Sequence, residues 1–109
     1  MSLLNIAFVQ LTPERTVQEN LKKGLAACRQ ASRMGADIAL FPEMWSIGYR
    51  ILDRPAAEWT AEALPANGAF SHAFAELAAQ LGIAIAVTLL EEHPGGPRNS
   101  LLLFDRRGN

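Results

Sequence analysis

Two short apolar segments flank one amphipathic helix, and this arrangement constrains the fold more than any other feature of the sequence. Residues 4–11 are almost continuously apolar, with β-branched and aromatic members, which predicts a strand buried on both faces. Residues 36–40 predict a second strand, and residues 17–34 predict the helix between them. Strands joined by a helical crossover run parallel in one sheet. The first third of the chain therefore predicts an α/β fold.

The predicted helix has a start signal, an apolar stripe and a stop signal. Thr16 and Glu19 fit a capping box, in which each side chain satisfies a free amide at the helix start. Gly35 supplies the stop. Apolar or small residues recur at the three-and-four spacing of one helical face, while Lys22 and Lys23 fall on the solvent side. The stripe consists of Val17, Leu21, Gly24, Leu25, Cys28 and Ala31.

The second half of the chain predicts one more substantial helix and a strand pair. Residues 69–81 carry a stripe of apolar side chains, and Ser71 is expected to be the N-cap. Residues 92–97 are expected to form a loop, because a short apolar run of strand length lies on each side. A parallel sheet needs layers on both faces, so two helices are expected to leave one face uncovered. Residues 105–109 have the composition of a turn.

Residues 41–45 contain the first candidate for a catalytic side chain. Pro42 stops the second predicted strand, and Glu43 follows it at the open end of the sheet. Crevices at this end of an α/β sheet are where such folds gather reacting groups. From these five residues alone, a solvated loop glutamate is the alternative.

Several short elements occur in a recognisable order: Gln10 at the end of the first strand, Asn20-Leu21 to Ala31, Met34 to Asp37, Leu40-Phe41-Pro42-Glu43, Gly48-Tyr49, Gly82 to Val87, Glu91, Asn99-Ser100, Phe104-Asp105 and Gly108. Their order and spacing resemble the nitrilase superfamily of carbon-nitrogen hydrolases over essentially the whole chain. The resemblance implies an α-β-β-α sandwich. It also implies a glutamate, lysine and cysteine triad that attacks an amide, carbamoyl or nitrile carbon, with no cofactor and no metal. Glu43 matches the glutamate, which serves as general base. A largely apolar crevice is expected around it, because such a site lets a carboxylate take up a proton more readily.

The other two triad members have no match in this sequence. Lys22 and Lys23 are the only lysines, and neither lies at a strand end; Cys28, the only cysteine, is expected to be an inert core residue. In the family, both missing residues belong to segments C-terminal to Asn109. Residues 1–109 are therefore expected to be the N-terminal part of a single hydrolase domain, whether truncated, cleaved or naturally split.

The resemblance also suggests substrate-binding residues and a function. Tyr49 and Trp45 are expected pocket walls, although packing of the loop is an equal alternative for Trp45. Residues 55–64 are expected to add a short helix anchored by Trp59. The expected reaction is hydrolysis of a small amide or carbamoyl compound, with a nitrile less favoured. The alternative is a non-catalytic α/β subunit or binding module that keeps the scaffold and pairs with another chain.

Composition limits the other possibilities. A net charge of −1 with scattered arginines argues against nucleic-acid binding. His72 and His93 lack partners at metal-ligand spacing. One cysteine, no membrane-length apolar stretch and no signal-peptide pattern predict a cytoplasmic protein without a membrane partner. The expected partners are the small substrate, the remaining C-terminal part of the fold and further copies of the same chain.

Overall fold

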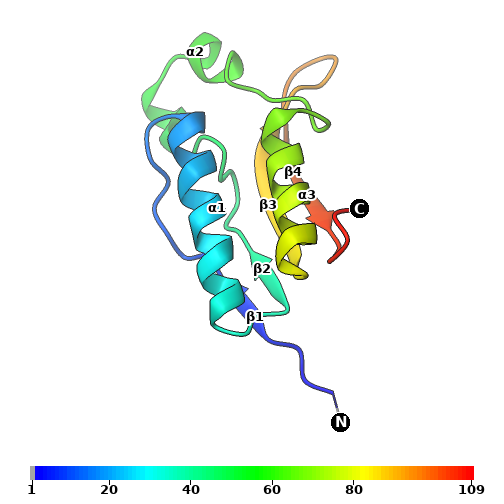
Figure 1. Ribbon diagram of the computed structural model, residues 1–109. Coiled ribbons are helices and arrows are strands. Elements are labelled where there is room, and N and C mark those ends of the chain that lie inside the picture. Colours follow the sequence, from blue (N-terminus) through cyan, green and yellow to red (C-terminus); the bar gives the residue numbers. More distant parts are fainter. Residues whose placement is uncertain (1) are drawn as a thin grey trace.

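The computed structural model describes residues 2–109 and shows one four-stranded sheet in the order β1-β2-β3-β4 (Figure 1). The strands are β1 (Ile6–Phe8), β2 (Ile38–Leu40), β3 (Ala84–Glu91) and β4 (Arg98–Phe104). β1, β2 and β3 are parallel, and β4 runs antiparallel to β3. The structure confirms the predicted α/β class, the β-α-β crossover and the later strand pair.

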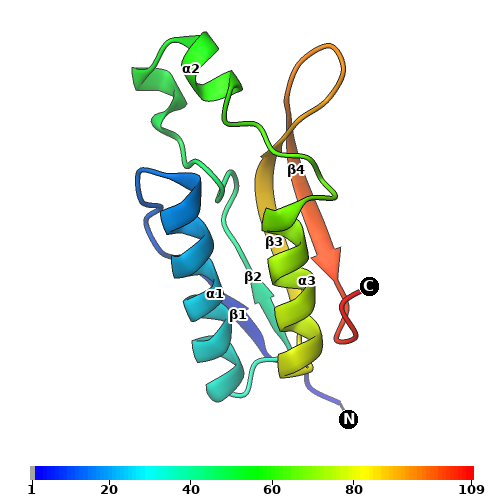
Figure 2. The same cartoon turned by 45° about the horizontal axis from the view of Figure 1, so that its top comes forward.

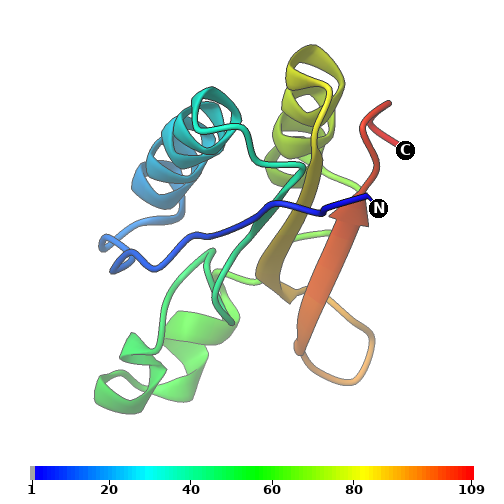
Figure 3. The ribbon, with the colours of Figure 1, turned by 90° about the horizontal axis from the view of Figure 1, so that it is seen from below.

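Two long helices lie side by side on one face of this sheet, as the end-on view shows (Figure 3). They are α1 (Val17–Arg33) and α3 (Ala69–Leu81), and both match their predicted ranges closely. The connection from β2 to α3 contains a short 3-10 helix (Arg50–Asp53) and α2 (Ala56–Thr60), which lie beyond the ends of the long helices (Figure 2). None of the described helices has both the length and the apolar composition needed to span a bilayer.

The helix ends follow the predicted signals with two differences. At α1, the Thr16 hydroxyl accepts a hydrogen bond from the Glu19 amide at 3.1 Å, as predicted. The Glu19 carboxylate accepts a hydrogen bond from the Thr16 hydroxyl, whereas a capping box would pair it with the Thr16 backbone amide. At α3, the N-cap is Gly68, and the prediction of Ser71 as N-cap is wrong. Ser71 lies inside the first turn, where its hydroxyl accepts the Gly68 amide and donates to the Ala66 carbonyl. The serine therefore still satisfies the helix start, from three residues further along.

The first strand is shorter and more exposed than predicted. It covers Ile6–Phe8 instead of residues 4–11, and the side chains of Ile6 and Phe8 are 45% and 63% exposed. β1 is an edge strand that pairs with β2, and Ala7 is its residue that packs against the core between sheet and helices. The prediction of a strand buried on both faces is therefore wrong for the part of the chain that the structure describes.

The sheet face opposite the helices carries an apolar surface, as the two-helix count predicted. Phe8, Leu40, Ala86 and Leu103 are paired in register and form one row across the strands. Leu103 is 61% exposed. We call this surface the open sheet face; it comprises Ile6, Phe8, Ile38, Leu40, Leu101 and Leu103.

The core between the helices and the sheet is aromatic and depends on a glycine in α1. Phe41 lies 5.3 Å from Trp45 and 5.4 Å from Phe74, measured between ring centroids. A Cβ atom at Gly24 would lie 2.7 Å from the Trp45 indole nitrogen and 2.9 Å from the Phe74 ring. Gly24 therefore lets these rings pack directly against the helix backbone.

Substitution Gly24→Ala is expected to lower the free energy of unfolding of the complete protein by about 1–3 kcal/mol, because overpacking displaces buried rings. This cost outweighs the roughly 0.5–1 kcal/mol that alanine gains over glycine within a helix. Urea denaturation measures the difference. A matched control is Ala26→Gly on the exposed side of α1. This substitution should lower the free energy of unfolding only by the difference in helix propensity between alanine and glycine. A stabilised Gly24→Ala variant would contradict the packing described here.

Candidate active site

Glu43 lies in a sharp turn of the backbone directly after β2. Met44 has φ +60°, and it is the one non-glycine residue among residues 2–109 with a positive φ. The Gly48 amide donates to the Met44 carbonyl at 2.6 Å and closes the turn. Met44 and Trp45 are buried, whereas Glu43 is exposed. A non-glycine residue in this region is uncommon, and strained backbone of this kind concentrates at functional sites.

Polar groups of β3 hold both sides of this turn. The Thr88 hydroxyl donates to the Pro42 carbonyl and accepts the Trp45 amide at 3.0 Å. The Ser46 hydroxyl accepts the Leu90 amide, also at 3.0 Å. Both hydroxyl-bearing residues are buried, so these bonds are shielded from water. The backbone that carries Glu43 is therefore fixed to the longest strand of the sheet.

Asn20 of α1 fixes the same turn from the helix side. Its side-chain amide donates to the Ser46 carbonyl at 3.0 Å, and its own backbone carbonyl accepts the Trp45 indole N–H at 2.9 Å. Asn20 and Trp45 are both fully buried. The aromatic core and the turn are thus connected by two buried hydrogen bonds.

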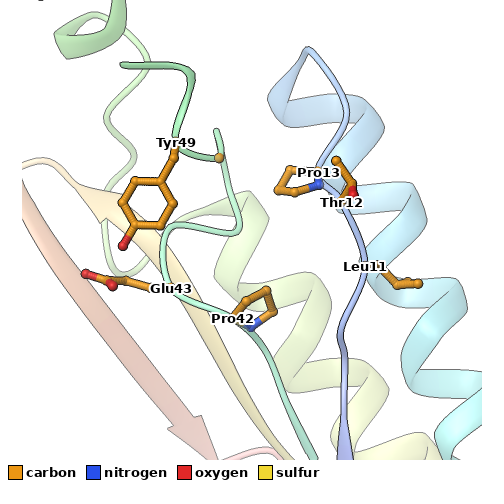
Figure 4. A pocket seen from close by; sticks show the side chains of 7 residues that line it. Leu11, Thr12, Pro13, Pro42, Glu43 and Tyr49 are labelled. Atoms are coloured by element: carbon orange, nitrogen blue, oxygen red, sulfur yellow. The ribbon is translucent and has the colours of Figure 1, made fainter. Parts of the chain in front are cut away.

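The Glu43 carboxylate meets two neutral donor groups. The Asn99 side-chain amide of β4 donates to Glu43 Oε1. The Tyr49 side chain points toward the same carboxylate (Figure 4). Hydrogen bonding to Glu43 raises the pKa of Tyr49, and burial and the negative charge of Glu43 add to the effect. The phenol therefore stays protonated and remains a donor.

Glu43 and Tyr49 line a small cavity between this turn and the segment after β1. The cavity has a volume of about 320 Å³, and its lining is mainly apolar. It is lined by Leu11, Thr12, Pro13, Pro42, Glu43, Gly48 and Tyr49. Glu43 itself is exposed at the edge of the cavity. The expected apolar crevice around the carboxylate is therefore only partly formed by residues 2–109.

Trp45 does not line this cavity. It is fully buried, packs against Phe41 and donates its indole N–H to the backbone of Asn20. Of the two roles that the sequence left open, packing of the loop is the one this structure shows. Tyr49 is 55% exposed and contributes to the cavity wall.

The two lysines and the cysteine lie away from Glu43 on α1. Lys23 bonds to the Thr12 carbonyl and pairs with Glu14 at 2.8 Å, and Lys22 is exposed. Cys28 is fully buried in the core, as predicted, and burial raises the pKa of its thiol to about 12. A thiol in this environment is protonated near neutral pH and is a poor nucleophile.

Native Cys28 is expected to resist alkylation by iodoacetamide at pH 8, because the thiolate is scarce below a thiol pKa of about 12 and the side chain is fully enclosed. Peptide mapping by mass spectrometry measures the labelling, and the same protein in urea is the positive control. Cys28→Ala should cost about 1 kcal/mol of stability and leave activity unchanged. Rapid labelling of the folded protein would contradict the core assignment.

Other polar candidates make local contacts. His72 bonds to Asn67, and His93 bonds to the adjacent Pro94 carbonyl. Glu91 accepts the Ser100 hydroxyl at 2.7 Å. No three histidine, cysteine, aspartate or glutamate side chains among residues 2–109 are placed to share a metal ion.

Comparison with known proteins identifies a family that this chain resembles. The model of the carbon-nitrogen hydrolase family matches residues 5–109. An amidase from Nesterenkonia sp. superposes with a TM-score of 0.69 at 28% identity, covering 96% of this chain and 39% of that chain. A cysteine-to-serine mutant of the Nesterenkonia AN1 amidase from the nitrilase superfamily gives 0.71 at 28% identity, covering 99% and 41%.

A cysteine-to-alanine mutant of the Nesterenkonia sp. AN1 amidase in complex with butyramide also gives a TM-score of 0.71 at 28% identity, covering 97% of this chain and 40% of that chain. Comparison with curated protein sequences found no match. This chain spans about 40% of the length of the solved amidase chains it matches.

Proposed function

The chain belongs to the carbon-nitrogen hydrolase family, matched over residues 5–109, and from this premise we propose that it supplies the general base of an amide-hydrolysing enzyme. Glu43 is the proposed base. The observation that carries the proposal is the placement of its carboxylate at the end of parallel strand β2, on a clamped turn beside a small cavity. The carboxyl ends of parallel strands are where α/β folds hold reacting groups.

Glu43 would take the proton of the attacking group and return it to the departing nitrogen. In the triad that the resemblance implies, a cysteine thiolate attacks the amide carbon, ammonia leaves, and water then releases the acid from the acyl intermediate. A lysine would stabilise the negative charge on the oxygen in the transition state. We assign the cysteine and lysine to segments outside this chain, because Cys28, Lys22 and Lys23 all lie on α1 and serve other roles or face solvent.

An amide is favoured over a nitrile as the substrate class, with a carbamoyl compound as the second candidate. The solved relatives described above are amidases, and one of them holds butyramide. The cavity beside Glu43, at about 320 Å³, has the size of a small-molecule site. Its mainly apolar walls suit a short aliphatic chain.

The remaining part of the same fold is the proposed partner of the open sheet face. The chain is an incomplete α-β-β-α sandwich, and its helices cover one face of the sheet (Figure 3). A second sheet packed on Phe8 and Leu103 would bury the side chains that are 63% and 61% exposed. Homo-oligomer formation and a cytoplasmic location stay predictions.

Ammonia release tests the proposed function. The complete protein should be assayed with short aliphatic amides, carbamoyl compounds and the nitriles of the same chain length. We expect the amides to give the highest kcat/KM. A folded protein that releases no ammonia from any of them would support the alternative of a non-catalytic module that keeps this scaffold.

A further inference from the structure

The Glu43 carboxylate accepts a hydrogen bond from a strand that is far away in the sequence. Asn99 lies in β4, opposite Leu90 of β3, and its side-chain amide donates to Glu43 Oε1 across a separation of 56 residues. The next residue, Ser100, points to the other face of the strand and donates to Glu91 instead. The pairing of β3 with β4 is therefore what brings the Asn99 amide to Glu43.

The chemistry of this donor suits a carboxylate that must exchange a proton. Asn99 and the protonated Tyr49 hydroxyl are both neutral donors, whereas a lysine or arginine would add a full positive charge that favours the ionised form of a carboxylate. Two neutral donors can fix the orientation of the carboxylate without neutralising its charge. Orientation matters because a displacement of about 1 Å at a reacting group can cost about 10²-fold in rate.

We propose that Asn99 is a positioning residue that acts through Glu43. It orients the Glu43 carboxylate so that one of the carboxylate's remaining lone pairs points toward the proton to be taken up. This inference rests on the proposed function, and it adds a role for β4 that the sequence pattern did not assign. Asn99 does not touch the substrate in this scheme. Its removal should therefore reduce kcat and leave KM nearly unchanged.

The first test compares Asn99→Ala with the matched control Ser100→Ala in the complete hydrolase. Asn99→Ala should lower kcat for a short aliphatic amide by about 10–100-fold, with KM within about threefold of wild type. Ser100→Ala removes a hydroxyl from the adjacent position and should change kcat by less than about threefold. Asn99→Asp keeps the size of the side chain but loses the donor, so its kcat should fall at least as far as that of Asn99→Ala. Circular dichroism and the melting temperature confirm folding.

A double-mutant cycle separates positioning from a general structural effect. In the Glu43→Gln background, Asn99→Ala should lower the residual rate by less than about twofold, because a residue that acts through Glu43 has nothing left to position. Equal losses in both backgrounds would overturn the proposal, as would a wild-type kcat for Asn99→Ala. If the wild type is active and Asn99→Ala has the same kcat, only this inference is wrong. If the wild type hydrolyses no amide, the proposed function is wrong as well.

Discussion

Glu43→Gln in the complete hydrolase is expected to lower turnover of a short aliphatic amide by about 10²–10⁴-fold, the range that a positioned general acid-base contributes. Glutamine has the size of glutamate and an oxygen that can still accept the Asn99 amide, but it cannot take up a proton at neutral pH. The variant should therefore fold normally. Ammonia release measures the rate, and circular dichroism verifies the fold.

The control for this substitution is Glu91→Gln. Glu91 also lies at a strand end, where it accepts the Ser100 hydroxyl outside the cavity. Its substitution should leave turnover within about threefold of wild type, well below the effect expected for loss of a general base. A near-wild-type rate for Glu43→Gln would remove Glu43 from the mechanism.

Trp45→Ala is expected to have the largest effect on stability, lowering the free energy of unfolding by about 3–5 kcal/mol. The indole is fully buried, packs against Phe41 and donates to the Asn20 carbonyl. Its loss would leave a cavity beneath the Glu43 turn. Urea denaturation of the complete protein measures the change.

Trp59→Ala provides the matched comparison. Trp59 is partly buried in α2 and packs against the smaller cluster around Met44 and Ile47. Because more of its surface already meets water, its removal should cost less than that of Trp45. Equal costs for the two tryptophans would contradict the core described here.

The helices could be predicted from the sequence because their signals are local. Each of the two segments, residues 17–34 and 69–81, contains its complete apolar stripe. Thr16 and Gly35 mark the start and the end of the first helix. The exposure of β1 could not be predicted in this way. Whether Phe8 is covered depends on which layer lies over the sheet, and the apolar pattern of a strand does not contain that information.

The position of Glu43 was predictable, but the groups that hold it were not. A strand followed by Pro42 is a local pattern, whereas the bonds from Thr88 and Asn99 span 46 and 56 residues and depend on strand order and register. A threonine within the apolar run of β3 is the signal that could have pointed to the clamp, since a buried hydroxyl needs partners. Trp45 was ambiguous because its neighbours in sequence do not tell which way the turn directs it.

The rate at which the acyl intermediate forms is the most direct test of the proposal that Glu43 accepts the proton in amide hydrolysis. The complete hydrolase, wild type and Glu43→Gln, should be mixed with butyramide and followed by intact-mass spectrometry during the first turnover. We expect the acyl adduct to form at least about 10²-fold more slowly in Glu43→Gln than in wild type. An adduct that forms at the same rate in both proteins would contradict a role for Glu43 as the general base.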